Sequence, residues 1–311
     1  MLAIVCPGQG SQTPGFLAPW LELPEFRRRL ESLSEVAGLD LVAHGTTSDA
    51  ETIKDTAVAQ PLIVGAGLAT AAVLFPDGAS AVGVTAGHSV GEITAAAFAG
   101  VLTDRDATLF TRERAQGMAA ASAVTPTGMS AVLGGDPAEV AAALERHGLT
   151  AANANGAGQV VAAGTLEQLA TLAADPPAKA RVIPLKVAGA FHTHHMAPAV
   201  QGLQVLAEDF DVSDPGITLL SNADGQAVTS AQDVVGRLVR QVGNPVRWDL
   251  CMQKMLDLGV TALVELPPAG TLVGLAKRAM PAVATLAVKT PDDLEAAKQL
   301  ISEHTNDAQK A

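Results

Sequence analysis

The sequence contains no tyrosine and few other aromatic residues, with seven Phe and two Trp among 311 residues. Proteins that bind single-stranded nucleic acid usually stack its bases on aromatic side chains, so their scarcity disfavours such a surface. Basic residues are also outnumbered, because 20 Lys and Arg face 32 Asp and Glu, and the formal net charge is −12. Binding a phosphate backbone requires a basic face. We therefore expect no nucleic-acid partner, although a small anion can still bind at a single Arg or Lys.

Cysteines and long hydrophobic runs are scarce as well. The two cysteines, Cys6 and Cys251, are too few for a framework of disulfides, so we expect a reducing, cytoplasmic location. The first residues lack the basic segment and the long apolar stretch of a secretory signal. The longest apolar run, residues 63–75, is shorter than the about 20 residues that a membrane-spanning helix needs. It predicts a buried core helix, and we expect no membrane association.

Apolar residues make up 48% of the chain, and their spacing predicts an α/β protein. Residues 2–5 and 81–85 read as buried strands, and each run is followed by a glycine-rich segment. Residues 24–36 read as an amphipathic helix. Strands that are apolar on both faces and alternate with helices predict a mainly parallel sheet covered by helices, as in hydrolase-like folds.

A different pattern occupies residues 126–187. It reads as strand, helix, strand, strand, helix, strand, which is the ferredoxin-like order. The two central strands, at 149–154 and 159–163, are joined by an Asn-Gly-Ala-Gly turn. We therefore predict a ferredoxin-like small subdomain inserted into a larger hydrolase-like α/β unit, which comprises residues 1–125 and 188–311.

The segment Gly87-His-Ser-Val-Gly91 matches the G-x-S-x-G pattern of a nucleophile elbow. A serine on a sharp strand-to-helix turn needs small neighbours on both sides, because the backbone packs tightly there. A predicted strand precedes the segment and an alanine-rich helix follows it, and the first amides of that helix suit a developing oxyanion. The alternative is a glycine-flanked helix start that Ser89 caps. The position between strand and helix favours the nucleophile.

A serine nucleophile needs a base, and three of the seven histidines cluster in Phe191-His-Thr-His-His195. Imidazoles are also common metal ligands. However, no Cys, Asp or Glu lies within ten residues on either side of the cluster to complete a local set of ligands. The sequence thus favours a catalytic role for one histidine and predicts no metal site. Spacing alone does not select among the three.

Two arginines follow the elbow helix, Arg112 and Arg114. A guanidinium holds both oxygens of a carboxylate in a fixed geometry, so either could bind a substrate carboxylate. The alternative is a solvated helix face. The loop Pro7-Gly-Gln-Gly-Ser-Gln12 matches neither a dinucleotide nor a Walker phosphate motif. We expect this loop to supply a backbone N–H beside the serine.

Four motifs, taken in order, carry a family resemblance: Pro7-Gly-Gln-Gly-Ser-Gln12, Gly87-His-Ser-Val-Gly-Glu92, Ala190-Phe-His-Thr-His-His-Met196 and Arg240-Gln-Val-Gly-Asn-Pro245. Together they span nearly the whole chain. In this combination the sequence resembles the malonyl-CoA:acyl-carrier-protein transacylases of type II fatty acid synthesis. It is also similar to the acyltransferase domains of polyketide synthases.

The resemblance implies a role for each matched position. Ser89 takes the place of the acyl-accepting nucleophile and His192 that of the general base. The main-chain carbonyl of Gln241 takes the place of the group that orients the imidazole. Arg114, 25 residues after the serine, matches the arginine that binds the malonyl carboxylate, and Arg112 is the lesser candidate. Two further residues, Gln9 and Val90, match the amides of the oxyanion hole.

Three neighbouring residues are assigned supporting or selectivity roles by the same resemblance. Phe191, which precedes the histidine, resembles the form found in malonyl-selective polyketide acyltransferases. Asn155, in the turn of the inserted unit, and His88, beside the nucleophile, are candidates for supporting the site.

The implied reaction is a ping-pong transfer of malonyl from malonyl-CoA to the phosphopantetheine thiol of holo acyl carrier protein, for fatty acid or polyketide synthesis. It requires no cofactor, and we expect a monomer. Alternatives are a serine hydrolase or thioesterase on the same elbow, a malonate-decarboxylase transacylase, and a non-catalytic scaffold. An acidic carrier would need a local basic patch on this acidic chain, for which Arg181, Lys186 and Lys277 are candidates.

Overall fold

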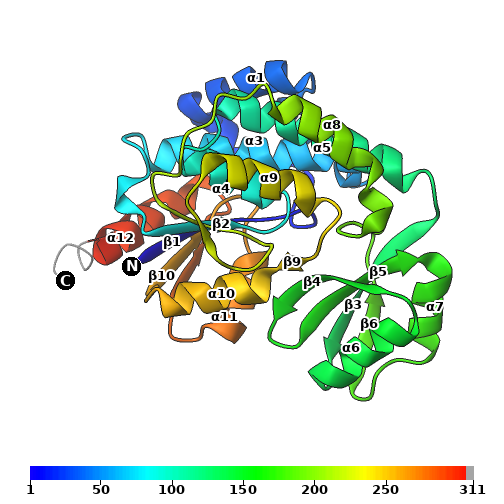
Figure 1. Cartoon of the computed structure of the whole chain (residues 1–311). Coiled ribbons are helices and arrows are strands. Elements are labelled where there is room, and N and C mark those ends of the chain that lie inside the picture. Colours follow the sequence, from blue (N-terminus) through cyan, green and yellow to red (C-terminus); the bar gives the residue numbers. More distant parts are fainter. Residues whose placement is uncertain (306–311) are drawn as a thin grey trace.

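The computed structural model describes residues 1–305, which form two sheets and the helices that cover them (Figure 1). The larger sheet has the strand order β11-β10-β1-β2-β7-β8. All neighbouring strands in it are parallel except β7 and β8. The prediction of a mainly parallel sheet is confirmed. Its strands are β1 (Leu2–Cys6), β2 (Val84–Gly87), β7 (Thr218–Leu220), β8 (Ala227–Val228), β10 (Ala262–Glu265) and β11 (Ala284–Ala287).

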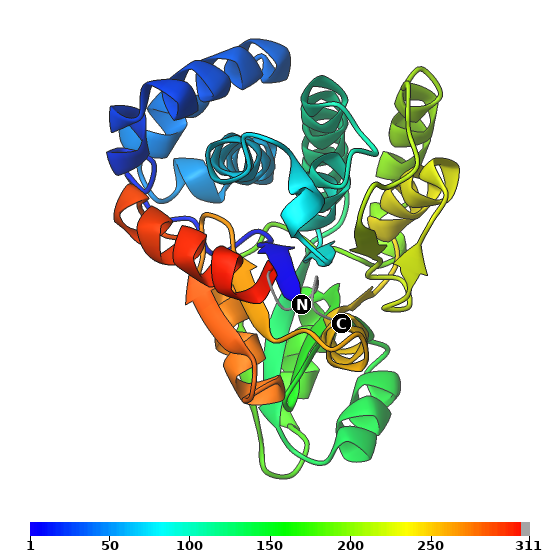
Figure 2. The same ribbon diagram turned by 90° about the vertical axis from the view of Figure 1, so that its left-hand side faces the viewer.

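Helices cover both faces of the large sheet, because its strands are apolar on both faces. In β1, Leu2 and Ile4 join one hydrophobic cluster while Ala3 and Val5 join the other. Figure 1 shows α10 and α11 on one face and α3, α4 and α5 on the other. Figure 2 shows that α12 runs beside β1. The helices of this unit are α1 (Pro24–Ala37), α2 (Leu41–Thr46), α3 (Thr56–Leu74), α4 (Gly91–Phe98), α5 (Asp104–Ser122), α8 (Pro198–Ala207), α9 (Ala231–Gln241), α10 (Trp248–Asp257), α11 (Thr271–Ala279) and α12 (Leu294–Thr305).

Helix α3 contains most of the long apolar run. By length and composition it could cross a membrane, but 78% of its most apolar window is buried inside the protein. It packs against α1, α4 and α5. These contacts bury its apolar surface, as the prediction of a core helix requires.

The second sheet has the order β6-β3-β5-β4-β9. Its first four strands, β6, β3, β5 and β4, pair with one another in antiparallel fashion. Chain order and strand order together give the ferredoxin-like arrangement that the sequence predicts. The sequence did not predict β9, a two-residue strand that the larger unit contributes parallel to β4. We keep 126–187 as the proposed extent of the inserted unit. Its elements are β3 (Thr127–Gly134), α6 (Pro137–Arg146), β4 (Thr150–Gly156), β5 (Gln159–Thr165), α7 (Leu166–Ala174) and β6 (Ala180–Pro184), and β9 is Val246–Arg247.

Two predicted boundaries were wrong. The strand expected at 81–85 lies at Val84–Gly87, because Ala79–Ala81 forms a 3₁₀ turn. Asn155, expected in a turn, lies inside β4, and the reversal occurs at residues 157 and 158, both of which have positive φ. The first shift brings the end of β2 directly to the G-x-S-x-G segment. The second places Asn155 on a strand that faces it.

Candidate active site

Ser89 lies on a sharp turn between β2 and α4. Its φ is +53°, a left-handed conformation that is uncommon for residues other than glycine. A Cβ on Gly87 would overlap the carbonyl carbon of Gly91, and one on Gly91 would overlap the main-chain oxygen of Cys6. Because no side chain fits at either position, both glycines are needed for this turn. The backbone N–H of Ser89 donates to Oδ1 of Asn222 at 2.8 Å. Asn222 lies in the segment after β7, so this segment helps to stabilise the turn.

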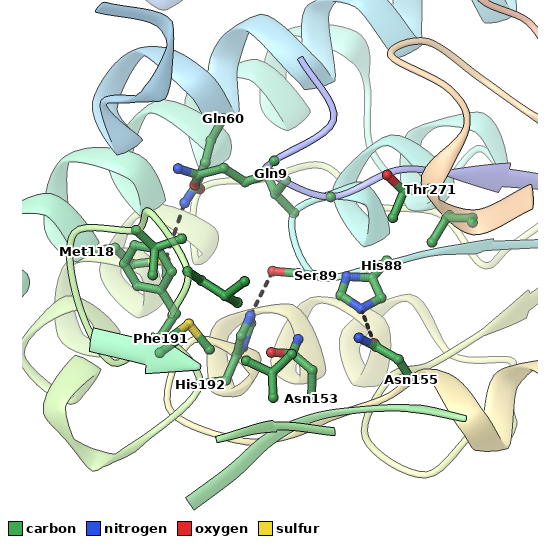
Figure 3. A pocket seen from close by; sticks show the side chains of 18 of the residues that line it. Gln9, Gln60, His88, Ser89, Met118, Asn153, Asn155, Phe191, His192 and Thr271 are labelled. Atoms are coloured by element: carbon green, nitrogen blue, oxygen red, sulfur yellow. Dashed lines mark hydrogen bonds between the residues drawn. The ribbon is translucent and has the colours of Figure 1, made fainter. Parts of the chain in front are cut away.

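His192 faces the serine from a second strained position, with φ +62°. Its Nε2 lies 2.7 Å from Ser89 Oγ (Figure 3). On the other side of the ring, Nδ1 lies 2.9 Å from the main-chain oxygen of Gln241. A carbonyl oxygen can only accept, so Nδ1 carries the proton and Nε2 is left to accept the serine proton. The pair is 103 residues apart in the sequence and within direct hydrogen-bonding distance in the fold.

The electrostatic surroundings keep this imidazole neutral. Burial lowers the pKa of His192 to about 3, and the positive charge of Arg114 adds to the effect. The histidine is therefore unprotonated at neutral pH, the form that a general base requires.

Arg114 reaches the same point from α5 and is almost fully buried, with 1% of its surface exposed. Its Nη1 donates to Oε1 of Gln60 at 2.6 Å, and its Nη2 lies 2.8 Å from Oε1 of Gln241 and 3.2 Å from Ser89 Oγ. Nε has no partner within residues 1–305. Burial lowers the pKa of Arg114 to about 10, so the guanidinium stays charged at neutral pH beside Ser89.

The other arginine of the pair points elsewhere. Nη1 of Arg112 donates to the main-chain oxygen of Val36, at the end of α1, at 3.2 Å. Two residues along a helix turn a side chain by roughly 200°, so Arg112 and Arg114 project to opposite sides of α5. The structure brings only Arg114 to Ser89.

The loop after β1 runs directly past the elbow. A Cβ on Gly8 would lie 2.8 Å from the main-chain oxygen of His88, so this close approach requires glycine. The side chain of the next residue, Gln9, donates to the main-chain oxygen of Lys54, which fixes the loop. Gln9 and Val90, the N-cap residue of α4, line the same cleft as Ser89. Their place in the lining agrees with amides that face a bound substrate, and the oxyanion-hole role stays a prediction.

The cleft has a volume of about 240 Å³ and lies between the two sheets. Nε2 of His88 lies 2.9 Å from Oδ1 of Asn155 on β4 (Figure 3), and this bond joins the elbow to the inserted unit. Burial lowers the pKa of His88, so this ring is also neutral. Phe191, on the opposite wall, is buried and presents an apolar surface. The cleft is thus apolar on one side and carries Ser89, His192 and Arg114 at its base.

The remaining histidines of the cluster lie outside this cleft. His194 and His195 occupy a 3₁₀ turn with their rings 4.1 Å apart. Within residues 1–305 there is no group of three His, Cys, Asp or Glu side chains that could hold a metal ion.

Comparison with known proteins decides the family. The family model described as an acyl transferase domain matches residues 3–307. The chain belongs to the acyl transferase family. A curated relative from Mycobacterium tuberculosis, named malonyl CoA-acyl carrier protein transacylase, is 52% identical over 301 residues, covering 95% of this chain and 98% of the relative.

Solved structures of this acyl transferase family have the same fold. The crystal structure of MCAT from M. tuberculosis superimposes with a TM-score of 0.92 at 52% identity, over 96% of this chain and 99% of that one. A second structure, of a malonyl-transacylase in complex with a type II polyketide synthase acyl-carrier protein, gives a TM-score of 0.89 at 31% identity, over 96% and 99% of the two chains. The predicted resemblance to the malonyl transacylases is confirmed.

Sequence reasoning missed a layer of polar residues behind Ser89 of this acyl transferase. Glu92, in the first turn of α4, and Asn222, after β7, are both buried there. The side chain of Gln241, predicted only for its carbonyl, joins them. Two signals could have revealed them. Glu92 is the only charged residue of an otherwise apolar helix, and Asn222 follows a strand of the parallel sheet, where ligand sites usually lie.

Proposed function

We propose that this acyltransferase moves a malonyl group from malonyl-CoA to the phosphopantetheine thiol of holo acyl carrier protein, through an ester on Ser89. The observation that carries the proposal is Arg114 Nη2, which lies 3.2 Å from Ser89 Oγ while the guanidinium is buried and charged. A buried cation at this distance favours an acyl group that carries its own negative charge. Relatives named malonyl CoA-acyl carrier protein transacylase support the assignment.

In the first half-reaction Ser89 Oγ attacks the thioester carbonyl of malonyl-CoA, and His192 Nε2 takes the serine proton. The amides of Gln9 and Val90 stabilise the negative charge on the carbonyl oxygen. The C–S bond then breaks, and the proton on Nε2 passes to the sulfur, so that coenzyme A leaves as a thiol. The carbonyl of Gln241 holds the imidazole in the required tautomer.

In the second half-reaction the thiol of the carrier protein gives its proton to His192 and attacks the ester carbon. The C–O bond to Ser89 breaks and the serine oxygen recovers the proton. His192 therefore serves as base and acid in turn, and no redox or nucleotide cofactor enters the balance. Malonyl is the acyl group that Arg114 would hold in place during both steps.

Two alternatives are less favoured. A serine hydrolase or thioesterase orients its histidine with an Asp or Glu, whereas Nδ1 of His192 meets a main-chain carbonyl. A malonate-decarboxylase transacylase would perform the same chemistry on a different carrier. A transfer assay with purified holo carriers separates these possibilities, because rapid hydrolysis of malonyl-CoA without a carrier would favour the hydrolase.

We expect the partner to be an acidic carrier protein and the enzyme to be a cytoplasmic monomer. A malonyl-transacylase relative is known in complex with a type II polyketide acyl-carrier protein, which supports carriers of fatty acid or polyketide synthesis as partners. Arg181, Lys186 and Lys277 are exposed, so they are accessible to such a carrier and would offset part of the long-range repulsion.

Intact-mass measurement tests the acyl-enzyme directly. After mixing with malonyl-CoA, the protein should gain the mass of one malonyl group, and peptide mapping should locate it on Ser89. The matched control is Ser89→Ala, which should gain nothing. An unmodified wild-type protein, or a label that persists in Ser89→Ala, would contradict the proposal.

A further inference from the structure

Behind the nucleophile, the buried carboxylate of Glu92 connects both halves of the site. One oxygen, Oε1, accepts the backbone N–H of Asn222 at 2.6 Å, and the other, Oε2, accepts from Nε2 of Gln241. We propose that Glu92 is a positioning residue that fixes the orientation of the Gln241 amide and, through it, the arginine that holds the malonyl carboxylate. The inference rests on the proposed function and adds a residue that sets its acyl selectivity.

The argument depends on the direction of each hydrogen bond. Nη2 of Arg114 can only donate, so the atom of Gln241 that faces it must be the oxygen Oε1. The amide nitrogen of Gln241 then has to face the opposite way, toward Ser89 O at 3.0 Å and toward Glu92. A group that meets this nitrogen must accept. The chain of bonds therefore runs from the guanidinium through the amide to the carboxylate in one direction only.

The other oxygen of Glu92, Oε1, is equally constrained. It faces the backbone N–H of Asn222, which cannot act as an acceptor. Two donors thus face the two oxygens of one buried side chain, and an ionised carboxylate accepts at both without an O–H of its own that would need a further acceptor. Asn222 in turn accepts from the backbone N–H of Ser89 and donates to Gly87 O at 2.8 Å. Glu92 consequently supports the turn that carries the nucleophile as well as the amide that orients Arg114.

Charge and access fit this role. Burial raises the pKa of Glu92 to about 7, while the hydrogen bonds from Asn222 and Gln241 and the charge of Arg114 act in the opposite direction. A separate cleft of about 500 Å³, called here the rear cleft, is lined by Glu92 and Gln241, and Ser89 is not among its lining residues. Protons can thus exchange at Glu92 while a substrate occupies the front cleft. Two other charged residues that line this rear cleft, Arg237 and Asp224, bond each other at 2.9 Å.

Glu92→Gln tests the direction argument with almost no change in size. The new amide keeps one acceptor, so either Asn222 N–H or Gln241 Nε2 must face an NH₂ group. If Gln241 flips to relieve this clash, its own NH₂ turns toward the guanidinium of Arg114. We expect malonyl transfer to fall at least tenfold in kcat/KM, mainly through KM. Acetyl transfer should fall by a clearly smaller factor, because acetyl has no carboxylate for the arginine to hold.

A compensating double variant, Glu92→Gln with Gln241→Glu, sharpens the test. The new amide at position 92 would then donate to the new carboxylate at position 241, which would still present an oxygen to Arg114. The chain of bonds is thus restored with its carboxylate displaced by one position. We expect the double variant to recover at least threefold in the malonyl-to-acetyl ratio over Glu92→Gln, although it loses the bond from residue 241 to Ser89 O. Gln241→Glu alone should not show this recovered malonyl-to-acetyl ratio.

The controls distinguish this inference from a failure of the proposed function. Labelling by a fluorophosphonate probe and the melting temperature show whether each variant is folded and has a reactive Ser89. If wild-type protein forms no malonyl-serine, the proposed function fails. If wild type is active but Glu92→Gln loses malonyl and acetyl transfer equally, or the double variant recovers nothing, Glu92 is only structural. If Glu92→Gln does not fold, Glu92→Asp replaces it, and an unchanged malonyl-to-acetyl ratio in that variant likewise overturns the inference.

Discussion

Two strand-to-helix junctions of the large sheet each bury a glutamate, but the two carboxylates meet different partners. At the end of β10, Glu265 accepts backbone N–H groups from Gly270, Leu272 and Val273, at 2.8 to 3.0 Å. At the start of α4, Glu92 accepts from Asn222 and from the side chain of Gln241. The partners of Glu265 lie five to eight residues away, whereas those of Glu92 lie 130 and 149 residues away.

This difference separates a carboxylate that stabilises one element from a carboxylate that positions several. Glu265 satisfies the free amides at the start of α11 and lies against the positive end of that helix, which are local effects. Glu92 instead ties together α4, α9 and the segment after β7, which meet behind Ser89. Burial raises the pKa of both glutamates, so this shift alone does not distinguish their roles. The partners do.

The largest effect should come from removing Arg114, which lies at the far end of the series of hydrogen bonds that starts at Glu92. Arg114→Ala removes the buried charge beside Ser89, and we expect malonyl transfer to fall by roughly 10- to 100-fold, from the about 1.5–3 kcal/mol of a hydrogen bond to a charged group. Acetyl transfer should rise relative to malonyl transfer. Parallel kcat/KM measurements with malonyl-CoA and acetyl-CoA check this, and Arg112→Ala is the matched control because its guanidinium bonds Val36 instead. Equal losses for both acyl groups would show that Arg114 is only structural.

A smaller and different effect should follow at the other junction. Glu265→Gln leaves a single acceptor oxygen for three backbone donors, so we expect the free energy of unfolding to fall by about 1–3 kcal/mol. The malonyl-to-acetyl ratio should stay the same, because the hydrogen bonds of Glu265 lead to the start of α11 and not to Arg114 or His192. Urea unfolding, read together with the two transfer rates, checks both parts. A changed ratio in Glu265→Gln would remove the distinction between the two glutamates.

The sequence predicted the parts of the site that lie in contiguous motifs. The glycines flanking Ser89 predicted the elbow, since a tight turn excludes side chains there. The four motifs together predicted the pairing of Ser89 with His192 and the place of Arg114. Strand ends were predicted less accurately. The run at 81–85 is apolar almost throughout, so its sequence does not indicate where pairing with β1 begins.

The polar layer behind Ser89 was not predictable in the same way. Glu92 was visible as one acidic residue in an apolar helix, but nothing near it in the sequence identifies Asn222 or the Gln241 amide as partners. Those contacts arise only when the parallel sheet brings β2 and β7 side by side. Hydrogen-bond direction, which carries the argument for Glu92, is a property of the assembled site.

The smallest effect, and the one that tests the ionised state of Glu92, is the pH dependence of acyl selectivity. The pKa of Glu92 is raised to about 7, so its carboxylate takes up a proton as the pH falls from 8 to 6, and one of its two oxygens then carries an O–H donor. Over this range His192, with a pKa of about 3, stays neutral, and Arg114, with a pKa of about 10, stays charged.

Other charged or titratable groups also surround Glu92. Burial raises the pKa of the Cys251 thiol on α10. In the rear cleft, hydrogen bonds lower the pKa of Asp224 and raise those of Arg237 and Arg247, and Arg240 lies beside them. Each of these pKa values is shifted further away from neutral pH. Glu92 is therefore the group expected to change its charge between pH 6 and pH 8.

The malonyl-to-acetyl ratio should therefore fall severalfold from pH 8 to pH 6 in wild type. It should be flat in Glu92→Gln, which has no carboxyl group to protonate at that position. Competition between malonyl-CoA and acetyl-CoA in one reaction measures the ratio directly and cancels any pH effect on the carrier thiol that both reactions share. A ratio that is constant in wild type, or that rises as the pH falls, would mean that the charge of Glu92 does not affect how Arg114 holds the acyl group. Glu92 would then resemble Glu265, a buried carboxylate whose contribution ends at its own helix.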